Sequence, residues 1–89
     1  MHILTIIIYT TEVCPRCNIL KKYFDSKNIS YKEEDMASVD SLTELAMNNI
    51  FTNAAPVLKI GDDFFTSDKL FKEMNVNESL IESYIESNK

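Results

Sequence analysis

Two cysteines separated by two residues, Cys14-Pro15-Arg16-Cys17, follow an apolar run and open an amphipathic segment. Proline is favoured at the first position of a helix, because the N–H group that it lacks has no partner there. Pro15 therefore predicts a helix start, with Cys14 at the N-cap and the backbone N–H groups of Arg16 and Cys17 near its sulfur. This constrains the chain to a strand, a short loop and a helix around the cysteine pair.

The predicted helix start makes Cys14 a reactive thiol. The partial positive charge of a helix N-terminus stabilises an anion by about 0.3–1 kcal/mol, and Arg16 adds a full positive charge beside it. In such surroundings the pKa of a cysteine falls from about 8.5 into a range of about 3.5–7.5. We therefore expect Cys14 to be largely ionised at neutral pH, and Cys14 and Cys17 to form a redox-active pair.

The composition is that of one small folded domain spanning residues 1–89, with 45% hydrophobic residues, four tyrosines and five phenylalanines. The only two cysteines are three positions apart, so a disulfide between them closes too short a loop to hold a secreted fold together. We therefore expect a cytoplasmic protein whose cysteines carry out chemistry.

The net charge of −5 disfavours nucleic acid and anionic membranes as partners. The apolar start of the chain lacks a basic region and a cleavage site, so it is interpreted as a buried strand and not as a signal peptide.

Hydrophobic periodicity predicts an α/β domain in the order βαβαββα. Strands are expected at residues 3–9 and 29–35, joined by a helix at 15–27 in a right-handed crossover. A second helix is expected at 38–49, with a capping box from Ser41 and Glu44. A hairpin at 57–60 and 64–66 turns at Gly61, and the rest is expected to be helical. The residues predicted to face the core are Ile19, Leu20, Tyr23 and Phe24 in the first helix, Val39, Leu42, Leu45, Ala46 and Ile50 in the second, and Leu70, Phe71, Met74, Leu80, Ile81, Tyr84 and Ile85 near the end.

This order resembles the glutaredoxin branch of the thioredoxin fold. The resemblance rests on the total length and on two segments, Tyr9-Thr10-Thr11-Glu12-Val13-Cys14-Pro15-Arg16-Cys17 and Ala54-Ala55-Pro56-Val57. It implies a four-stranded mixed sheet flanked by helices, and a cis Pro56 that faces the dithiol. It also implies that Cys14 attacks a substrate disulfide, that Cys17 resolves the mixed disulfide, and that the backbone of Ala55 binds an extended substrate.

The chain also departs from glutaredoxins that use glutathione. Ala54-Ala55-Pro56 stands where they have Thr-Val-Pro, and Phe65-Thr66-Ser67-Asp68 stands where they have a glycine pair. Ser67 and Asp68 are the candidates for holding the glutamyl end of glutathione. The segment 60–66 is more similar to the small glutaredoxin-like proteins that serve ribonucleotide reductase.

The resemblance therefore implies a monomer without a tightly bound cofactor that reduces protein disulfides, with ribonucleotide reductase as the leading client. Its electrons are expected from a flavoprotein disulfide reductase of the thioredoxin reductase kind, or from glutathione.

Several residues have a second interpretation. The cysteine pair is alternatively structural, or part of a binding module for zinc or for an iron–sulfur cluster shared between two chains. A structural zinc site needs four ligands. The only histidine, His2, lies at the end of the first predicted strand that is far from the cysteines. Arg16 and Lys21-Lys22 are alternatively solvated charges, and Pro56 a loop breaker. Glu33-Glu34-Asp35 is interpreted as a solvated patch, from which a carboxylate can move protons for Cys17.

Overall fold

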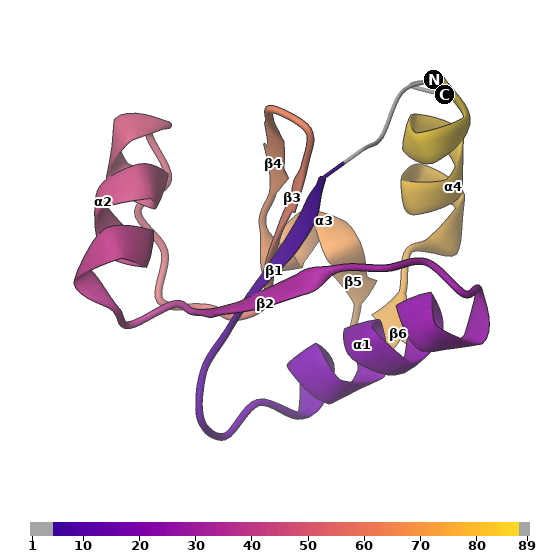
Figure 1. Cartoon of the computed structure of the whole chain (residues 1–89). Coiled ribbons are helices and arrows are strands. Elements are labelled where there is room, and N and C mark those ends of the chain that lie inside the picture. Colours follow the sequence, from indigo (N-terminus) through magenta and orange to yellow (C-terminus); the bar gives the residue numbers. More distant parts are fainter. Residues whose placement is uncertain (1–4, 88–89) are drawn as a thin grey trace.

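The β-branched run after Thr5 forms the central strand of a four-stranded sheet. A computed structural model describes residues 5–87 and gives the strand order β2-β1-β3-β4 (Figure 1). β1 (Ile6–Thr10) pairs in parallel with β2 (Lys32–Asp35) and antiparallel with β3 (Val57–Ile60), which continues into β4 (Asp63–Phe65). The predicted α/β class, the parallel crossover and the hairpin are confirmed; residues 3 and 4 of the first predicted strand lie outside the described residues.

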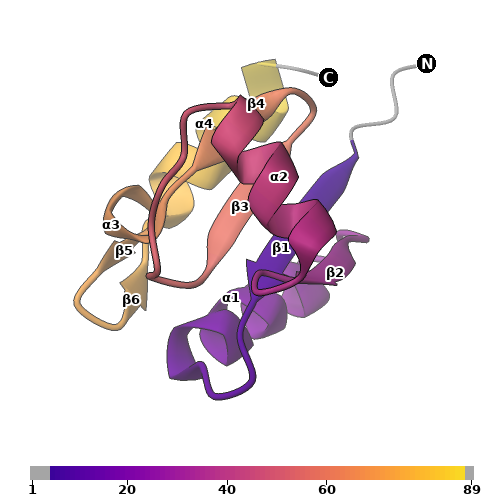
Figure 2. The same ribbon diagram turned by 90° about the vertical axis from the view of Figure 1, so that its left-hand side faces the viewer.

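Helices cover both faces of this sheet. The remaining elements are α1 (Pro15–Ser26), α2 (Val39–Met47), α3 (Ser67–Leu70), a two-stranded ribbon of β5 (Phe71–Lys72) and β6 (Asn75–Val76), and α4 (Glu78–Ser87). α2 lies alone on one side of the sheet, and α1 and α4 lie on the other (Figures 1 and 2). No helix within residues 5–87 is long and apolar enough to cross a membrane.

The side chains of β1 divide the core into two parts, because successive residues of a strand point to opposite faces. Ile6 and Ile8 pack on the side of α1 and α4, in a cluster that includes Leu20, Phe24, Leu58 and Ile81. Ile7 and Tyr9 pack on the side of α2, in a smaller cluster with Met36, Leu45 and Val57. β1 is therefore buried on both faces, as its nearly continuous apolar sequence predicts.

The first helix agrees closely with its prediction. α1 ends at Ser26, and Asn28 follows in the left-handed conformation with φ of 57°, which stops the helix. Leu20, Tyr23 and Phe24 are buried, and Ile19 packs against the same cluster. The following strand is shorter than predicted, because regular pairing begins only at Lys32.

The second helix corrects two predictions. Ser38 is its N-cap and accepts the Ser41 backbone N–H, whereas Glu44 pairs with Lys59 on β3 at 2.6 Å; the capping box from Ser41 and Glu44 is therefore wrong. The predicted core face is wrong for three of its five residues. Leu45 is buried as predicted and Ile50 packs against the same cluster. Within α2 only Ser41 and Leu45, one turn apart, are buried, and this register turns Val39, Leu42 and Ala46 outward.

The segment after β4 corrects a further prediction. Leu70, Phe71 and Met74 do not share one helix, because α3 ends at Leu70 and Phe71 begins the β5–β6 ribbon. Glu73 adopts a positive φ of 60° in its turn, which is incompatible with a continuous helix. Leu70 and Phe71 are still buried, whereas Met74 is 47% exposed. Asn77 then caps α4 by accepting the Leu80 backbone N–H, and Ile81 faces the core as predicted.

Tyr23 places a polar hydroxyl in the larger core cluster, where it costs stability. Its hydroxyl is buried and, although the Glu82 carboxylate lies close enough to raise its pKa, it makes no hydrogen bond to the described residues. Burial, with a smaller contribution from the Glu82 and Glu78 carboxylates, raises the pKa of Tyr23 from 10.0 to about 12. The folded state therefore holds this proton more tightly than the unfolded state does, and stability falls as pH rises from the unfolded value through the folded one.

We predict that Tyr23→Phe raises the free energy of unfolding by about 0.5–1.5 kcal/mol, because it removes an unpaired buried hydroxyl. The substitution should also weaken the loss of stability above pH 10. Chemical denaturation of the oxidised protein at pH 7 and at alkaline pH measures both effects. Tyr31→Phe is the control, because Tyr31 is only partly buried and its hydroxyl is not a buried unpaired group, so no gain is expected there. Destabilisation by Tyr23→Phe would show that the hydroxyl is satisfied.

Candidate functional site

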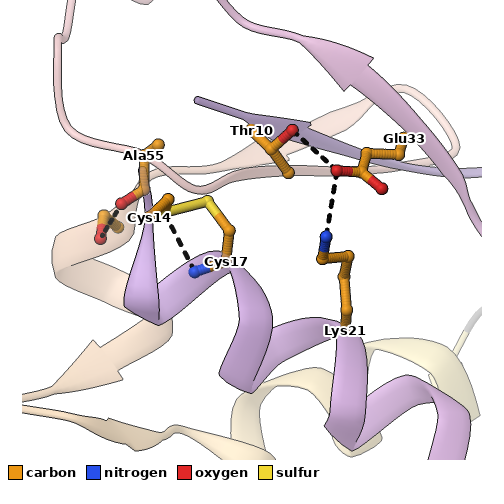
Figure 3. The surroundings of a disulfide bond; sticks show 7 residues. Thr10, Cys14, Cys17, Lys21, Glu33 and Ala55 are labelled. Atoms are coloured by element: carbon orange, nitrogen blue, oxygen red, sulfur yellow. Dashed lines mark hydrogen bonds and ion pairs between the residues drawn. A yellow bond between two sulfur atoms is a disulfide. The ribbon is translucent and has the colours of Figure 1, made fainter. Parts of the chain in front are cut away.

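The cysteine pair lies where β1 gives way to α1, at the carboxyl end of the central strand. Cys14 is the N-cap of α1 in an extended conformation, Pro15 occupies the first turn, and the Cys17 backbone N–H donates to the Cys14 sulfur at 3.0 Å. The two sulfurs form a disulfide (Figure 3). Cys14 is partly exposed, whereas Cys17 is 2% exposed. A client can therefore reach the first sulfur and not the second.

The segment before β3 lies beside Cys14. The Ala55–Pro56 peptide bond is cis and Pro56 is buried. Since β3 runs antiparallel to β1, with Val57 opposite Tyr9, this segment meets the end of β1 that carries the cysteines. Ala55 lies next to Cys14 in Figure 3, and its carbonyl accepts the Ser67 hydroxyl at 3.5 Å.

Arg16 points toward the β5–β6 ribbon. Its Nε donates to the Glu73 carbonyl at 3.0 Å, and its guanidinium lies over the Phe71 ring, 5.8 Å from the centroid. These contacts join the first turn of α1 to the turn of the ribbon, 57 residues further along the chain. Arg16 is therefore a structural link as well as a positive charge near the dithiol.

A cavity of about 360 Å³ opens on one side of the disulfide, between α1 and the end of β2. Lys21 and Glu33 form an ion pair at 3.1 Å across it, and Thr10 donates its hydroxyl to the same carboxylate oxygen at 3.0 Å (Figure 3). Hydrogen bonds from Lys21 first, and then from Thr10, lower the pKa of Glu33. Asp35 also lines this cavity, so that the end of β2 faces the dithiol with carboxylates.

A second cavity, of about 350 Å³, opens on the other side of Cys14. Val13 and Met74 border it together with Arg16 and Ala55. Val13 is 86% exposed, although it is apolar and directly precedes the reactive cysteine. Cys14 therefore borders two open cavities, one lined by carboxylates and the other partly by apolar side chains.

The structure brings together most of the predicted site residues. Cys14, Pro15, Arg16 and Ala55 border the second cavity, and Cys17 borders the first together with Cys14. Ser67 joins them only through Ala55 and is itself buried.

Asp68 lines neither of the two cavities beside the dithiol. Its carboxylate accepts the Thr66 hydroxyl, which lowers its pKa, and it borders a separate cavity near the start of α4.

The two cavities also contain residues that the sequence did not identify as site residues, which are Glu12 and Asn18 in the first and Asn53 and Met74 in the second. Glu33 and Asp35, from the acidic segment interpreted as a solvated patch that can move protons for Cys17, line the first cavity together with Cys17. One signal was present in the sequence: carboxyl ends of parallel strands meet at one edge of a sheet, which places 33–35 beside the cysteine loop. The β5–β6 ribbon carried no such signal. Within residues 5–87, no three or more His, Cys, Asp and Glu side chains cluster so that they could hold a metal ion.

Comparison with known proteins agrees with this geometry. A family model described as Glutaredoxin matches residues 6–65. Among solved structures, the chain is similar to the glutaredoxin-like protein NrdH-redoxin from Escherichia coli, which is described as having a thioredoxin-like activity profile. The match has a TM-score of 0.57 and 22% sequence identity, and it covers 70% of this chain and 80% of that one. No curated protein matches the sequence.

We predict that reduced Cys14 titrates well below the ordinary cysteine pKa of about 8.5, because the Cys17 N–H and the helix terminus stabilise its thiolate. Thiolate absorbance against pH measures this value. Arg16→Gln should raise the pKa by less than about one unit, since an exposed charge contributes about 0.2–1 kcal/mol. Lys22→Gln, which removes an exposed charge further along the helix, is the control. A pKa near 8.5 in the unsubstituted protein would contradict the role of the helix terminus.

Proposed function

Since the chain belongs to the glutaredoxin family, we propose that it is a small dithiol–disulfide oxidoreductase that reduces protein disulfides through Cys14 and Cys17. The observation that carries the proposal is the pairing of an accessible sulfur with a buried one at the start of a helix. A thiolate there is stabilised before the substrate arrives, and its resolving partner is protected from other thiols.

The reaction takes place in two exchanges. The Cys14 thiolate attacks one sulfur of the client disulfide, forms a mixed disulfide and expels the other client sulfur as a thiolate. Cys17 then loses its proton and attacks the Cys14 sulfur, which releases the second client thiol and closes the Cys14–Cys17 disulfide. Two electrons pass to the client, and a reductant must return them. The Cys17 N–H hydrogen bond favours each thiolate that forms on Cys14.

We propose a flavoprotein disulfide reductase as the electron source, in preference to glutathione. Ser67, a candidate for holding the glutamyl end of glutathione, is buried and donates to the Ala55 carbonyl. The other candidate, Asp68, is bonded to Thr66 and borders a cavity that Cys14 does not line. The thioredoxin-like activity described for NrdH-redoxin from Escherichia coli supports the same choice.

The proposed client is a protein disulfide, with ribonucleotide reductase as the leading candidate. This proposal rests on the similarity of the hairpin segment and the chain length to small redoxins that serve that enzyme. We further propose, from the same resemblance, that the protein works as a monomer in the cytoplasm, and that it needs no tightly bound cofactor because its two cysteines form the redox pair.

We predict that Cys14→Ser abolishes disulfide reduction, because it removes the attacking sulfur. Cys17→Ser should instead leave the first exchange intact and trap mixed disulfides with clients. Insulin reduction measures the first effect, and mass spectrometry of non-reduced adducts identifies trapped clients. Ser67→Ala leaves both cysteines in place and serves as the comparison. Full insulin reduction by Cys14→Ser would contradict the proposed mechanism.

We also predict that the oxidised protein is reduced rapidly by NADPH with thioredoxin reductase, and slowly by glutathione with glutathione reductase. Consumption of NADPH, followed with each reductase at matched concentration, measures the two rates. A conventional glutathione-using glutaredoxin assayed in parallel shows that the second system works. Faster recovery with glutathione would overturn the proposed electron source, although the oxidoreductase assignment would stand.

A further inference from the structure

The two sides of the dithiol differ in polarity. On the side of the β5–β6 ribbon, the cavity of about 350 Å³ is bordered by Val13, Ala55 and Met74, and it contains one cation, Arg16, and no carboxylate. Its volume is at the low end of the range for ligand pockets, about 300–1,000 Å³, which suits a side chain of a short peptide segment. Val13 and Met74 are exposed, so this rim offers apolar surface that a bound chain would bury.

The ribbon holds Met74 at this rim in a defined position. Phe71 and Val76 pair across the ribbon and pack against the larger core. Arg16 fixes the turn from the other side through the Glu73 carbonyl and the Phe71 ring. The ribbon side of this cavity is thus already ordered before a client binds, which lowers the entropic cost of binding.

On the opposite side of the disulfide, the cavity is acidic. Glu12, Glu33 and Asp35 line it, and Lys21 is the one cation among its lining residues. Because Lys21 is already paired with Glu33, Glu12 and Asp35 remain as negative charge beside the approach to Cys14. Figure 3 shows the disulfide between Ala55 on one side and the Thr10–Glu33–Lys21 cluster on the other.

We propose that the site selects an extended client segment that carries an apolar residue on one side of its cysteine and a basic residue on the other. The apolar side chain of the client lies in the cavity bordered by Val13 and Met74, and its basic side chain faces Glu12 and Asp35. This inference rests on the proposed function, because Cys14 must attack the sulfur between these two residues. Met74 and Glu12 are the specificity-determining residues.

The test uses peptides whose single cysteine carries thionitrobenzoate as a mixed disulfide. The pre-reduced protein attacks the peptide sulfur and expels thionitrobenzoate, and Cys17 then releases the peptide thiol, so every electron comes from the protein dithiol. Leucine and lysine flank the cysteine in both orders. The comparison peptides carry glycine on both sides, or the leucine beside the cysteine and the lysine four residues away at the same net charge.

In its preferred order, the leucine–lysine peptide should react about tenfold faster than the glycine peptide, since partial burial of a leucine and one exposed charge pair give gains of this size. Met74→Asp should abolish the advantage of leucine. Glu12→Gln should abolish the advantage of the adjacent lysine, and added salt should do the same. Met47→Asp on the exposed end of α2 and Glu34→Gln on β2 change the same groups outside both cavities, and they should leave both preferences unchanged.

Hydroxyethyl disulfide has no flanking residues, so its reduction tests the oxidoreductase activity separately from the client selectivity. For each variant, the peptide rates are divided by its own rate with hydroxyethyl disulfide. If the unsubstituted protein reduces hydroxyethyl disulfide but shows no preference among the peptides, the selectivity is refuted and the oxidoreductase stands. The same holds if Met47→Asp or Glu34→Gln reduces the preference as much as its partner variant does. Failure of the unsubstituted protein to reduce any disulfide would overturn both.

Discussion

The pairing of β1 on both of its edges is the constraint on which the site depends. Parallel pairing with β2 brings residues 33–35 to the carboxyl end of β1, and antiparallel pairing with β3 brings Ala55 and Pro56 to the same end. The cysteine loop leaves β1 at that point. Three segments that are distant in sequence therefore meet around one disulfide because a single apolar strand is buried on both faces and paired on both sides.

The helix that begins there provides the chemistry, and the second half of the chain provides its surroundings. The N-cap geometry of Cys14 and the Cys17 N–H are local properties of α1. The polarity around Cys14 is not local, because the acidic side comes largely from β2 and part of the apolar side comes from the β5–β6 ribbon. Reactivity and selectivity are therefore encoded in different parts of the sequence, and substitutions can change one and leave the other.

The same division explains what the sequence could predict. Patterns within one element were sufficient for β1, for α1 and for the cysteine pair at its start, since a proline at the first turn and a repeating apolar face depend on neighbours only a few residues away. The outward turn of Val39 and Leu42 could not be foreseen in this way. It depends on the packing of Leu45 against Tyr9 and Val57 of the sheet, and an amphipathic pattern does not show which of two apolar stripes is buried.

The β5–β6 ribbon is the clearest case in which tertiary contacts override local preference. The segment from Leu70 to Met74 has helical spacing of apolar residues, yet Glu73 adopts a left-handed conformation and its carbonyl is bound by Arg16. A hydrogen bond from a charged donor is stronger than one between neutral groups, and the guanidinium also lies over the Phe71 ring. The ribbon places Met74 beside Cys14, so a segment whose own sequence favours a helix instead adds apolar surface next to the dithiol.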